Sequence, residues 1–171
     1  NVIIGFKTND KGINIAFPLK EGFIVHGGSS EKINYHYADK TAQHYALDIT
    51  KLNTKGLRAS GFFPDDLKKY AIYGDTVFSP CDGKIVKLQD GLDNVPPGVV
   101  DKSHPAGNYI IIQYDNNLII FAHLLKSTLL VKMGDFVKKS QPIARIGNSG
   151  HTSEPHLHMH AISGIDTSKI L

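Results

Sequence analysis

The sequence contains a single cysteine among its 171 residues. One cysteine cannot form a disulfide within the chain, so cysteine usage gives no sign of an oxidising compartment. Cys81 stands in "SPCDGKIV", where a turn enters an apolar strand. We expect a small buried side chain at this position, not a catalytic thiol.

Long apolar runs and dense basic clusters are also missing. No stretch approaches the roughly 18 apolar residues of a membrane-spanning helix, and no signal peptide is visible. Because the chain starts at Asn1 and not at Met, we expect a mature or trimmed fragment whose targeting segment could be missing. The net charge of +3 fits an anionic polymer or surface as a partner. Nucleic acid is not indicated, because the sequence has no dense basic patch interleaved with aromatic residues.

Convincing helices are scarce, and short apolar runs between turn residues dominate. Their Ile, Val, Phe and Tyr content is typical of strands. Strands are expected in "KGINIAFPL", "GFIVHGG", "TVFSP", "GKIVKL", "NYIIIQY", "NLIIFAHLL", "DFVKK" and "PIARIGN". The clearest hairpin joins two of these runs at Asp115-Asn116-Asn117, residue types that tolerate tight turns. The sequence therefore predicts an all-β fold, mainly antiparallel, as a sandwich or open barrel.

The length of 171 residues suits one domain over residues 1–171. One short helix is expected in "FPDDLKKYAIY", with Pro64 at its start. Two segments, 51–73 and 89–107, look like insertions; long loops in a compact β domain are usually functional rims or lids. Gly74–Val77 and Gly134–Val137 both follow the pattern Gly-Asp-x-Val. This weak repeat raises the alternative of a lipoyl- or biotinyl-like carrier domain.

The stretch "PHLHMH" (155–160) places three histidines on alternate positions. In a strand, alternate side chains share a face and lie roughly 6–7 Å apart. His156, His158 and His160 would then point one way, while Leu157 and Met159 point into the core. The alternatives are a metal site and a solvent-facing polar row.

Two further elements favour the metal site. "QHYALDIT" offers His44 and Asp48 at i and i+4, which share a face in a strand or a helix. Two imidazoles and one carboxylate make a plausible zinc set with an open fourth position. His123 follows the apolar run in "IIFAHLL", where a general acid or base would be held rigidly, although a histidine there is often only structural.

In this order, His-x-x-x-Asp, "FAHL" and "GDFVKKSQPIARIGNSGHTSEPHLHMH" resemble the lysostaphin-type zinc metallopeptidases, over roughly residues 44–162. The resemblance implies a mainly antiparallel β domain that hydrolyses peptide bonds of bacterial peptidoglycan. It implies zinc ligands His44, Asp48 and His158 and catalytic histidines His123 and His156. For His160 the alternatives are a place behind the ligands and the surface, and we favour the surface.

The mechanism that the resemblance implies uses a zinc-bound water, whose pKa falls toward ~7, to attack the amide carbonyl. No His-Glu-x-x-His motif supplies a carboxylate base, so His123 and His156 are expected to orient or deprotonate the water and to protonate the leaving amine. Such an enzyme would act outside the cytoplasm on peptidoglycan peptides. The main alternative is a non-cleaving regulatory or cell-wall-binding relative, and the cleaved bond stays open.

Overall fold

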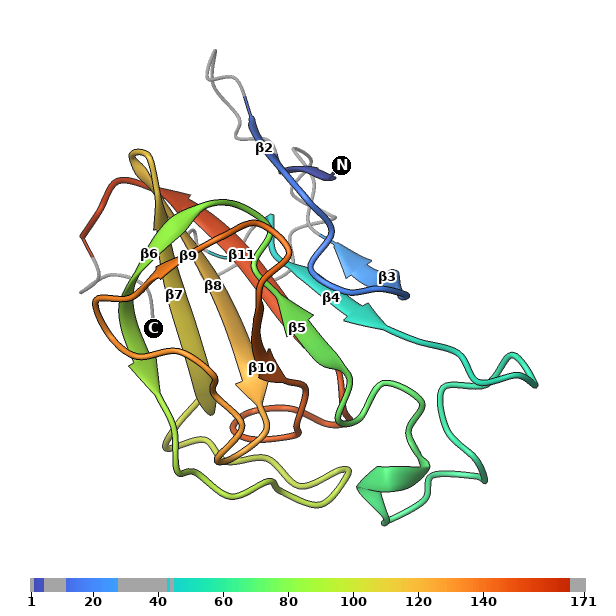
Figure 1. Ribbon diagram of the computed structural model, residues 1–171. Coiled ribbons are helices and arrows are strands. Elements are labelled where there is room, and N and C mark those ends of the chain that lie inside the picture. The colour runs from blue at the N-terminus through green and yellow to red at the C-terminus, as the bar shows by residue number, and fades with distance from the viewer. Residues whose placement is uncertain (1, 5–11, 28–42, 44, 167–171) are drawn as a thin grey trace.

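The computed structural model describes residues 2–4, 12–27, 43 and 45–166. His44, one of the expected zinc ligands, lies outside these described residues. Within them, one large antiparallel sheet organises the chain, with the strand order β3-β4-β11-β8-β7-β6-β9. The sheet stays open, because β3 and β9 are its two edges (Figure 1). The prediction of a mainly antiparallel all-β fold is therefore confirmed.

The strands of the large sheet are 2 to 8 residues long. Its members are β3 (Phe23–Gly27), β4 (Leu47–Thr50), β6 (Gly83–Gln89), β7 (Asn108–Tyr114), β8 (Asn117–Leu124), β9 (Phe136–Val137) and β11 (Leu157–Ser163). Two smaller antiparallel sheets pair β1 (Val2–Ile4) with β2 (Ile13–Ile15), and β5 (Thr76–Phe78) with β10 (Pro142–Arg145). The expected hairpin is the β7–β8 pair, and its turn places Asp115 at a φ of 51°.

The helical element that lies wholly within the described residues is a 3₁₀ turn, Leu67–Lys69. It begins three residues after Pro64, so that proline does not start it. Asp66 caps the turn instead, since its carboxylate accepts a hydrogen bond from the Lys68 backbone N–H at 3.0 Å. No helix in the described part of the chain has the length and apolar character needed to cross a membrane.

The main core lies between the large sheet and the β5–β10 pair. It joins Val77 of β5 and Ile143 of β10 to Ile110, Phe121 and other side chains of the large sheet. Cys81 belongs to this core and is 5% exposed, as expected, and burial raises the pKa of its thiol to about 12.

A second apolar cluster covers part of the opposite face of the large sheet, called here the outer face. Its buried members are Tyr109, Ile111, Leu118 and Ile120. These residues alternate with the main-core residues along β7 and β8, so both faces of the central hairpin are apolar. Polar side chains on the outer face next to this cluster therefore sit against an apolar surface.

Candidate metal and catalytic site

The β11 strand shows the alternation expected of "HLHMH". Leu157 and Met159 are buried in the main core. His158 and His160 therefore point to the outer face, since successive side chains of a strand alternate. Their strand is central, because β11 pairs with β4 on one side and β8 on the other. The backbone that carries these imidazoles is consequently held from both sides.

His123 reaches the same face through a β-bulge near the end of β8. The pairing register shifts between Asn108 and Ile110 of β7, so that two residues of β8, Ala122 and His123, stand opposite one residue of β7. Phe121 and Leu124, on either side of this pair, both belong to the main core. Without the bulge His123 would point into the core; with it, the imidazole joins β11 on the outer face.

The bulge also strains the backbone at His123. Its φ is 62°, a left-handed conformation that is uncommon for a residue other than glycine. Two hydrogen bonds hold it, from the His123 N–H to Ala106 O and from the Gly147 N–H to His123 O, each at 3.0 Å. Such locally enforced strain is concentrated at functional sites.

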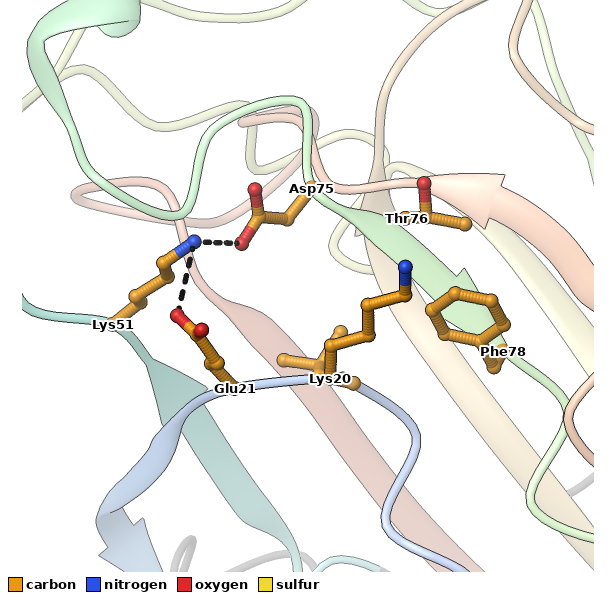
Figure 2. A pocket seen from close by; sticks show the side chains of 7 residues that line it. Lys20, Glu21, Lys51, Asp75, Thr76 and Phe78 are labelled. Carbon is orange, nitrogen blue, oxygen red and sulfur yellow. Dashed lines mark hydrogen bonds and ion pairs between the residues drawn. The ribbon is translucent and has the colours of Figure 1, made fainter.

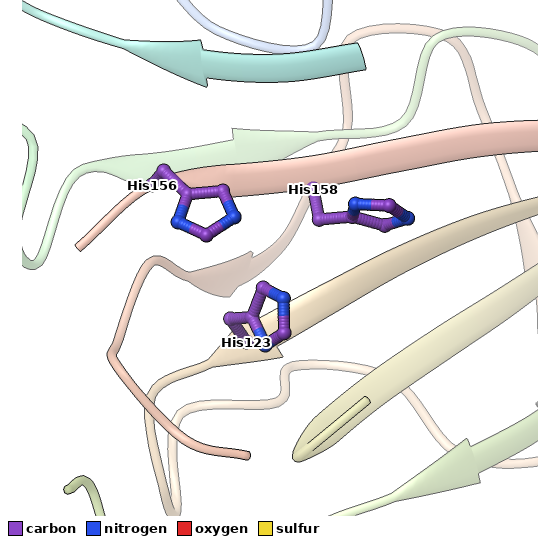
Figure 3. Close-up of side chains that lie close together, drawn as sticks. All are labelled: His123, His156 and His158. Atoms are coloured by element: carbon purple, nitrogen blue, oxygen red, sulfur yellow. The ribbon is translucent and has the colours of Figure 1, made fainter. Parts of the chain in front are cut away.

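These elements bring three imidazoles together, as Figure 3 shows. One ring nitrogen from each of His123, His156 and His158 lies within 4.8 Å of the others. The ring centroids of His123 and His156 are 4.8 Å apart, and those of His123 and His158 are 5.8 Å apart. Residues separated by more than 30 positions in the sequence thus form one compact cluster.

Asp48 of β4 lies against this cluster. Its Oδ1 is 3.0 Å from His158 Nδ1 and 3.4 Å from His156 Nε2. The pairing of His158 with Asp48 across β4 and β11 sets this contact. Of the five expected site residues, the structure gathers Asp48, His123, His156 and His158, while His44 lies outside the described residues.

His160 is buried and not on the surface, which corrects the sequence-based expectation. It is 2% exposed, and its Nδ1 lies 3.0 Å from His158 Nε2. Its cross-strand neighbour is Ile120, a member of the outer-face cluster. The continuous apolar runs of β7 and β8 were the sequence signal for burial on both faces.

Hydrogen-bonded carbonyls determine which nitrogens of His123 and His156 carry a proton. His123 Nδ1 is 2.8 Å from Ser149 O, and His156 Nδ1 is 2.9 Å from Glu154 O. A carbonyl oxygen only accepts, so each Nδ1 must be the donor. In both neutral rings Nε2 is then the basic nitrogen.

The two histidines differ in the direction of their pKa shifts. Burial, together with the nearby His156 and His158, holds the pKa of His123 well below its usual value. Burial also opposes the charged form of His156, but the hydrogen bond to Asp48 and its charge outweigh this and raise the pKa of His156. His123 is therefore a neutral group near pH 7, whereas His156 holds a proton more readily.

The donor set fits zinc. Zinc takes imidazole nitrogen and carboxylate oxygen at about 2.0–2.2 Å, so two ligands of a tetrahedral ion lie roughly 3.3–3.6 Å apart. The 3.0 Å between Asp48 Oδ1 and His158 Nδ1 is near that separation. A ligating histidine usually donates its other N–H to a nearby acceptor, and His160 Nδ1 stands in that position beside His158.

The two long segments that were expected to be functional both contact residues next to the histidine cluster. Arg58, in segment 51–73, forms an ion pair with Glu154. In segment 89–107, Asn94 accepts a hydrogen bond from the Asn148 backbone N–H at 2.8 Å. Sequence reasoning did not single out Asn148, Ser149 or Thr152, although all three lie in the stretch that carries the family resemblance.

A pocket of about 210 Å³ lies apart from the histidines, between β5 and the segments around Lys20 and Lys51 (Figure 2). The Lys51 ammonium lies 3.0 Å from Asp75 Oδ2 and 3.6 Å from Glu21 Oε2. Asp75 and Glu21 thus already balance its charge, and no histidine or cysteine lines the pocket. The candidate chemistry therefore belongs to the histidine cluster and not to this pocket.

The chain belongs to peptidase family M23, whose family model matches residues 67–166. An uncharacterized metalloprotease of Buchnera aphidicola is 31% identical in an alignment 170 positions long, which covers 92% of this chain and 39% of that protein. The peptidoglycan DD-endopeptidase ShyA of Vibrio cholerae is 42% identical in an alignment 127 positions long, which covers 70% of this chain and 27% of that protein. This membership supersedes the carrier-domain alternative.

The fold has counterparts among solved structures. The catalytic domain of lysostaphin from Staphylococcus simulans superposes with a TM-score of 0.50 at 21% identity, covering 92% of this chain and 85% of that one. This likeness supports the lysostaphin-type fold. The chain spans well under half the length of the two curated relatives above.

Proposed function

We propose that this chain is the catalytic domain of a zinc endopeptidase that hydrolyses peptide cross-links of bacterial peptidoglycan outside the cytoplasm. The observation that carries the proposal is the cluster of His123, His156 and His158 beside Asp48. Membership of family M23 and the similarity to a protein named as a peptidoglycan DD-endopeptidase support the reaction and the substrate class.

The proposed zinc ligands are His44, Asp48 and His158. The short contact between Asp48 and His158, and the placement of His160 behind His158, support two of the three. We assign His123 and His156 to proton transfer, as the resemblance to the family implies; carbonyl oxygens engage their Nδ1 atoms, which leaves Nε2 of each ring to exchange protons. When bound, zinc acts as a Lewis acid that activates water and polarises the scissile carbonyl.

His123 is suited to accept a proton. Its lowered pKa keeps the ring neutral near pH 7, and the hydrogen bond from Nδ1 to Ser149 O leaves the lone pair on Nε2. The strained backbone and the bulge hold this ring in place. A base fixed in this way needs little reorganisation when the substrate binds.

His156 is suited to carry the proton that the leaving amine needs. Its Nδ1 stays protonated against Glu154 O, and the negative charge of Asp48 favours a second proton on Nε2. A cation bound at Asp48 would weaken that attraction, which helps His156 to release its proton. The pair therefore offers one group that takes a proton and one that gives it.

Metal content and product analysis on one preparation test the proposal. The chain, purified without chelator, should contain about one zinc per molecule by elemental analysis, matching a site of three protein ligands. Incubated with purified peptidoglycan of known cross-link type, it should release peptides with new amino termini, read by mass spectrometry. Bound zinc without any new amino terminus would instead support a non-cleaving relative, and absence of zinc would overturn the metal assignment.

A further inference from the structure

A buried hydroxyl lies directly behind His156. Thr152 is 2% exposed, and its Oγ1 is 3.2 Å from His156 Nδ1. The same oxygen is 2.8 Å from Glu154 O and 3.1 Å from Asn148 Oδ1. Thr152 is neither a proposed zinc ligand nor a proposed proton-transfer group, yet it contacts the proton-transfer residue His156.

The direction of these hydrogen bonds follows from proton counting. The carbonyl oxygen of Glu154 and the amide oxygen of Asn148 can only accept, so one of them takes the single hydroxyl proton of Thr152. Toward His156 the hydroxyl therefore presents a lone pair. His156 Nδ1 consequently faces two acceptors, Thr152 Oγ1 and Glu154 O, which together fix its proton on Nδ1 and leave Nε2 facing Asp48.

Segment 89–107 supports Thr152 Oγ1, the first of the two acceptors, through Asn148. The side-chain amide of Asn148 donates to Val95 O at 2.8 Å, which turns its Oδ1 toward Thr152. The Val95 N–H donates back to Asn148 O at 2.9 Å. Asn94 extends this partly buried network to Tyr73, whose hydroxyl accepts from Asn94 Nδ2 at 3.1 Å.

Segment 51–73 supports the second acceptor, Glu154 O. The ion pair between Arg58 and the Glu154 carboxylate fixes the residue whose backbone oxygen accepts from His156. Each long segment thus supports one of the two oxygens behind the ring. A histidine ring can turn over about its last side-chain bond unless its outer nitrogen is engaged, so these supports decide which nitrogen faces the site.

We propose that Thr152 is a positioning residue of this active site: its hydroxyl, which donates to Glu154 O or Asn148 Oδ1, keeps the His156 ring oriented with Nδ1–H toward Glu154 O and Nε2 toward Asp48. The catalytic part of this inference rests on the proposed function. The orientation of the ring does not, because it can be measured directly in the folded chain.

Kinetics on three variants test the catalytic part. Thr152→Val keeps the shape but removes the hydroxyl, Thr152→Ser keeps the hydroxyl, and Thr128→Val removes a comparable hydroxyl that donates to Leu125 O, away from His156. With zinc bound, T152V should lower kcat on a cross-linked peptide by roughly tenfold or more with KM nearly unchanged, the size typical for a residue supporting a site group. T152S should recover most of kcat, and T128V should match the native chain.

Long-range ¹H–¹⁵N correlation spectra of the zinc-loaded chain test the orientation itself. At alkaline pH, where the ring is neutral, the native chain and T152S should carry the His156 proton on Nδ1, and T152V should populate the Nε2–H form. A native proton on Nε2 would overturn the inference, and so would a T152V kcat equal to the native value or a T152S kcat as low as that of T152V. If no variant, native included, cleaves the peptide, the proposed function fails, while the spectra still decide on Thr152.

Discussion

Gly107 offers a sharp test of how the site is supported, because it lies in contact with the carbonyl that engages His123. Its φ is 59°, and a Cβ added there would lie 2.2 Å from Ser149 O and 2.4 Å from Ser149 C. Ser149 O accepts the hydrogen bond from His123 Nδ1 at 2.8 Å. Gly107→Ala must therefore displace the backbone oxygen that orients His123.

Two terms set the size of the effect. A left-handed backbone disfavours alanine by roughly 1–2 kcal/mol. Forcing a methyl group into backbone atoms adds about 1–3 kcal/mol, the range for overpacked sites. Gly56→Ala isolates the first term, because Gly56 has a φ of 75° with nothing within 4 Å of its added Cβ. We expect G107A to lower the free energy of unfolding by about 1–3 kcal/mol more than G56A.

Urea denaturation of the native chain, G107A and G56A measures this difference. If the m value is the same for all three proteins, each unfolds in the same two-state manner and their free energies of unfolding can be compared. Peptide hydrolysis by the same proteins should show a loss of kcat in G107A only, since G56A leaves His123 in place. Equal destabilisation by the two substitutions, or full activity in G107A, would refute the claim that Gly107 is needed for the close approach to Ser149.

Three further predictions concern single side chains. His123→Ala should lower kcat by about 10²–10⁴-fold, the usual contribution of a general acid or base, while elemental analysis still finds zinc near one per chain; loss of the metal would count against the proposed ligand set. Asp48→Ala should remove most of the rise in Tm that zinc gives to the metal-depleted chain, because ligand binding stabilises only the state that binds; an undiminished rise would exclude Asp48 as a ligand. Cys81 has a pKa raised from 9.0 to about 12, so above pH 9 the unfolded chain loses a proton that the native chain keeps, and stability falls by up to about 4 kcal/mol toward pH 12. Urea titrations at several pH values should show a shallower alkaline decline in Cys81→Ala than in the native chain, and identical slopes would contradict the assignment.

The strands of the fold could be predicted because their signal is local. Apolar runs bounded by turn residues placed β5, β6, β7, β8 and β10, and the Asp115-Asn116 turn identified the β7–β8 hairpin. The expected helix was less well placed, because Asp66, and not Pro64, begins the turn. Helix starts depend on which side chain caps the free N–H groups, and several neighbouring residues there could do so.

The alternation of "PHLHMH" was sufficient to place Leu157 and Met159 in the core and the histidines on the outer face. It could not separate His160 from the others, because all three share the same periodicity. Burial of His160 follows from its cross-strand neighbour Ile120 and from contact with His158. Those are long-range pairings, and the sequence period carries no information about them.

The sequence by itself determined most of the strands, the face of each β11 side chain and the ordered set of residues that resembles the family. Only the tertiary structure decided that His123 shares that face, since one extra residue in the β8 bulge reverses the direction of every later side chain. It also decided which nitrogens of His123 and His156 carry protons. The oxygens that fix these protons belong to Ser149, Thr152 and Glu154, in the segment between β10 and β11. Hydrogen-bond geometry of this kind exists only once the chain is folded.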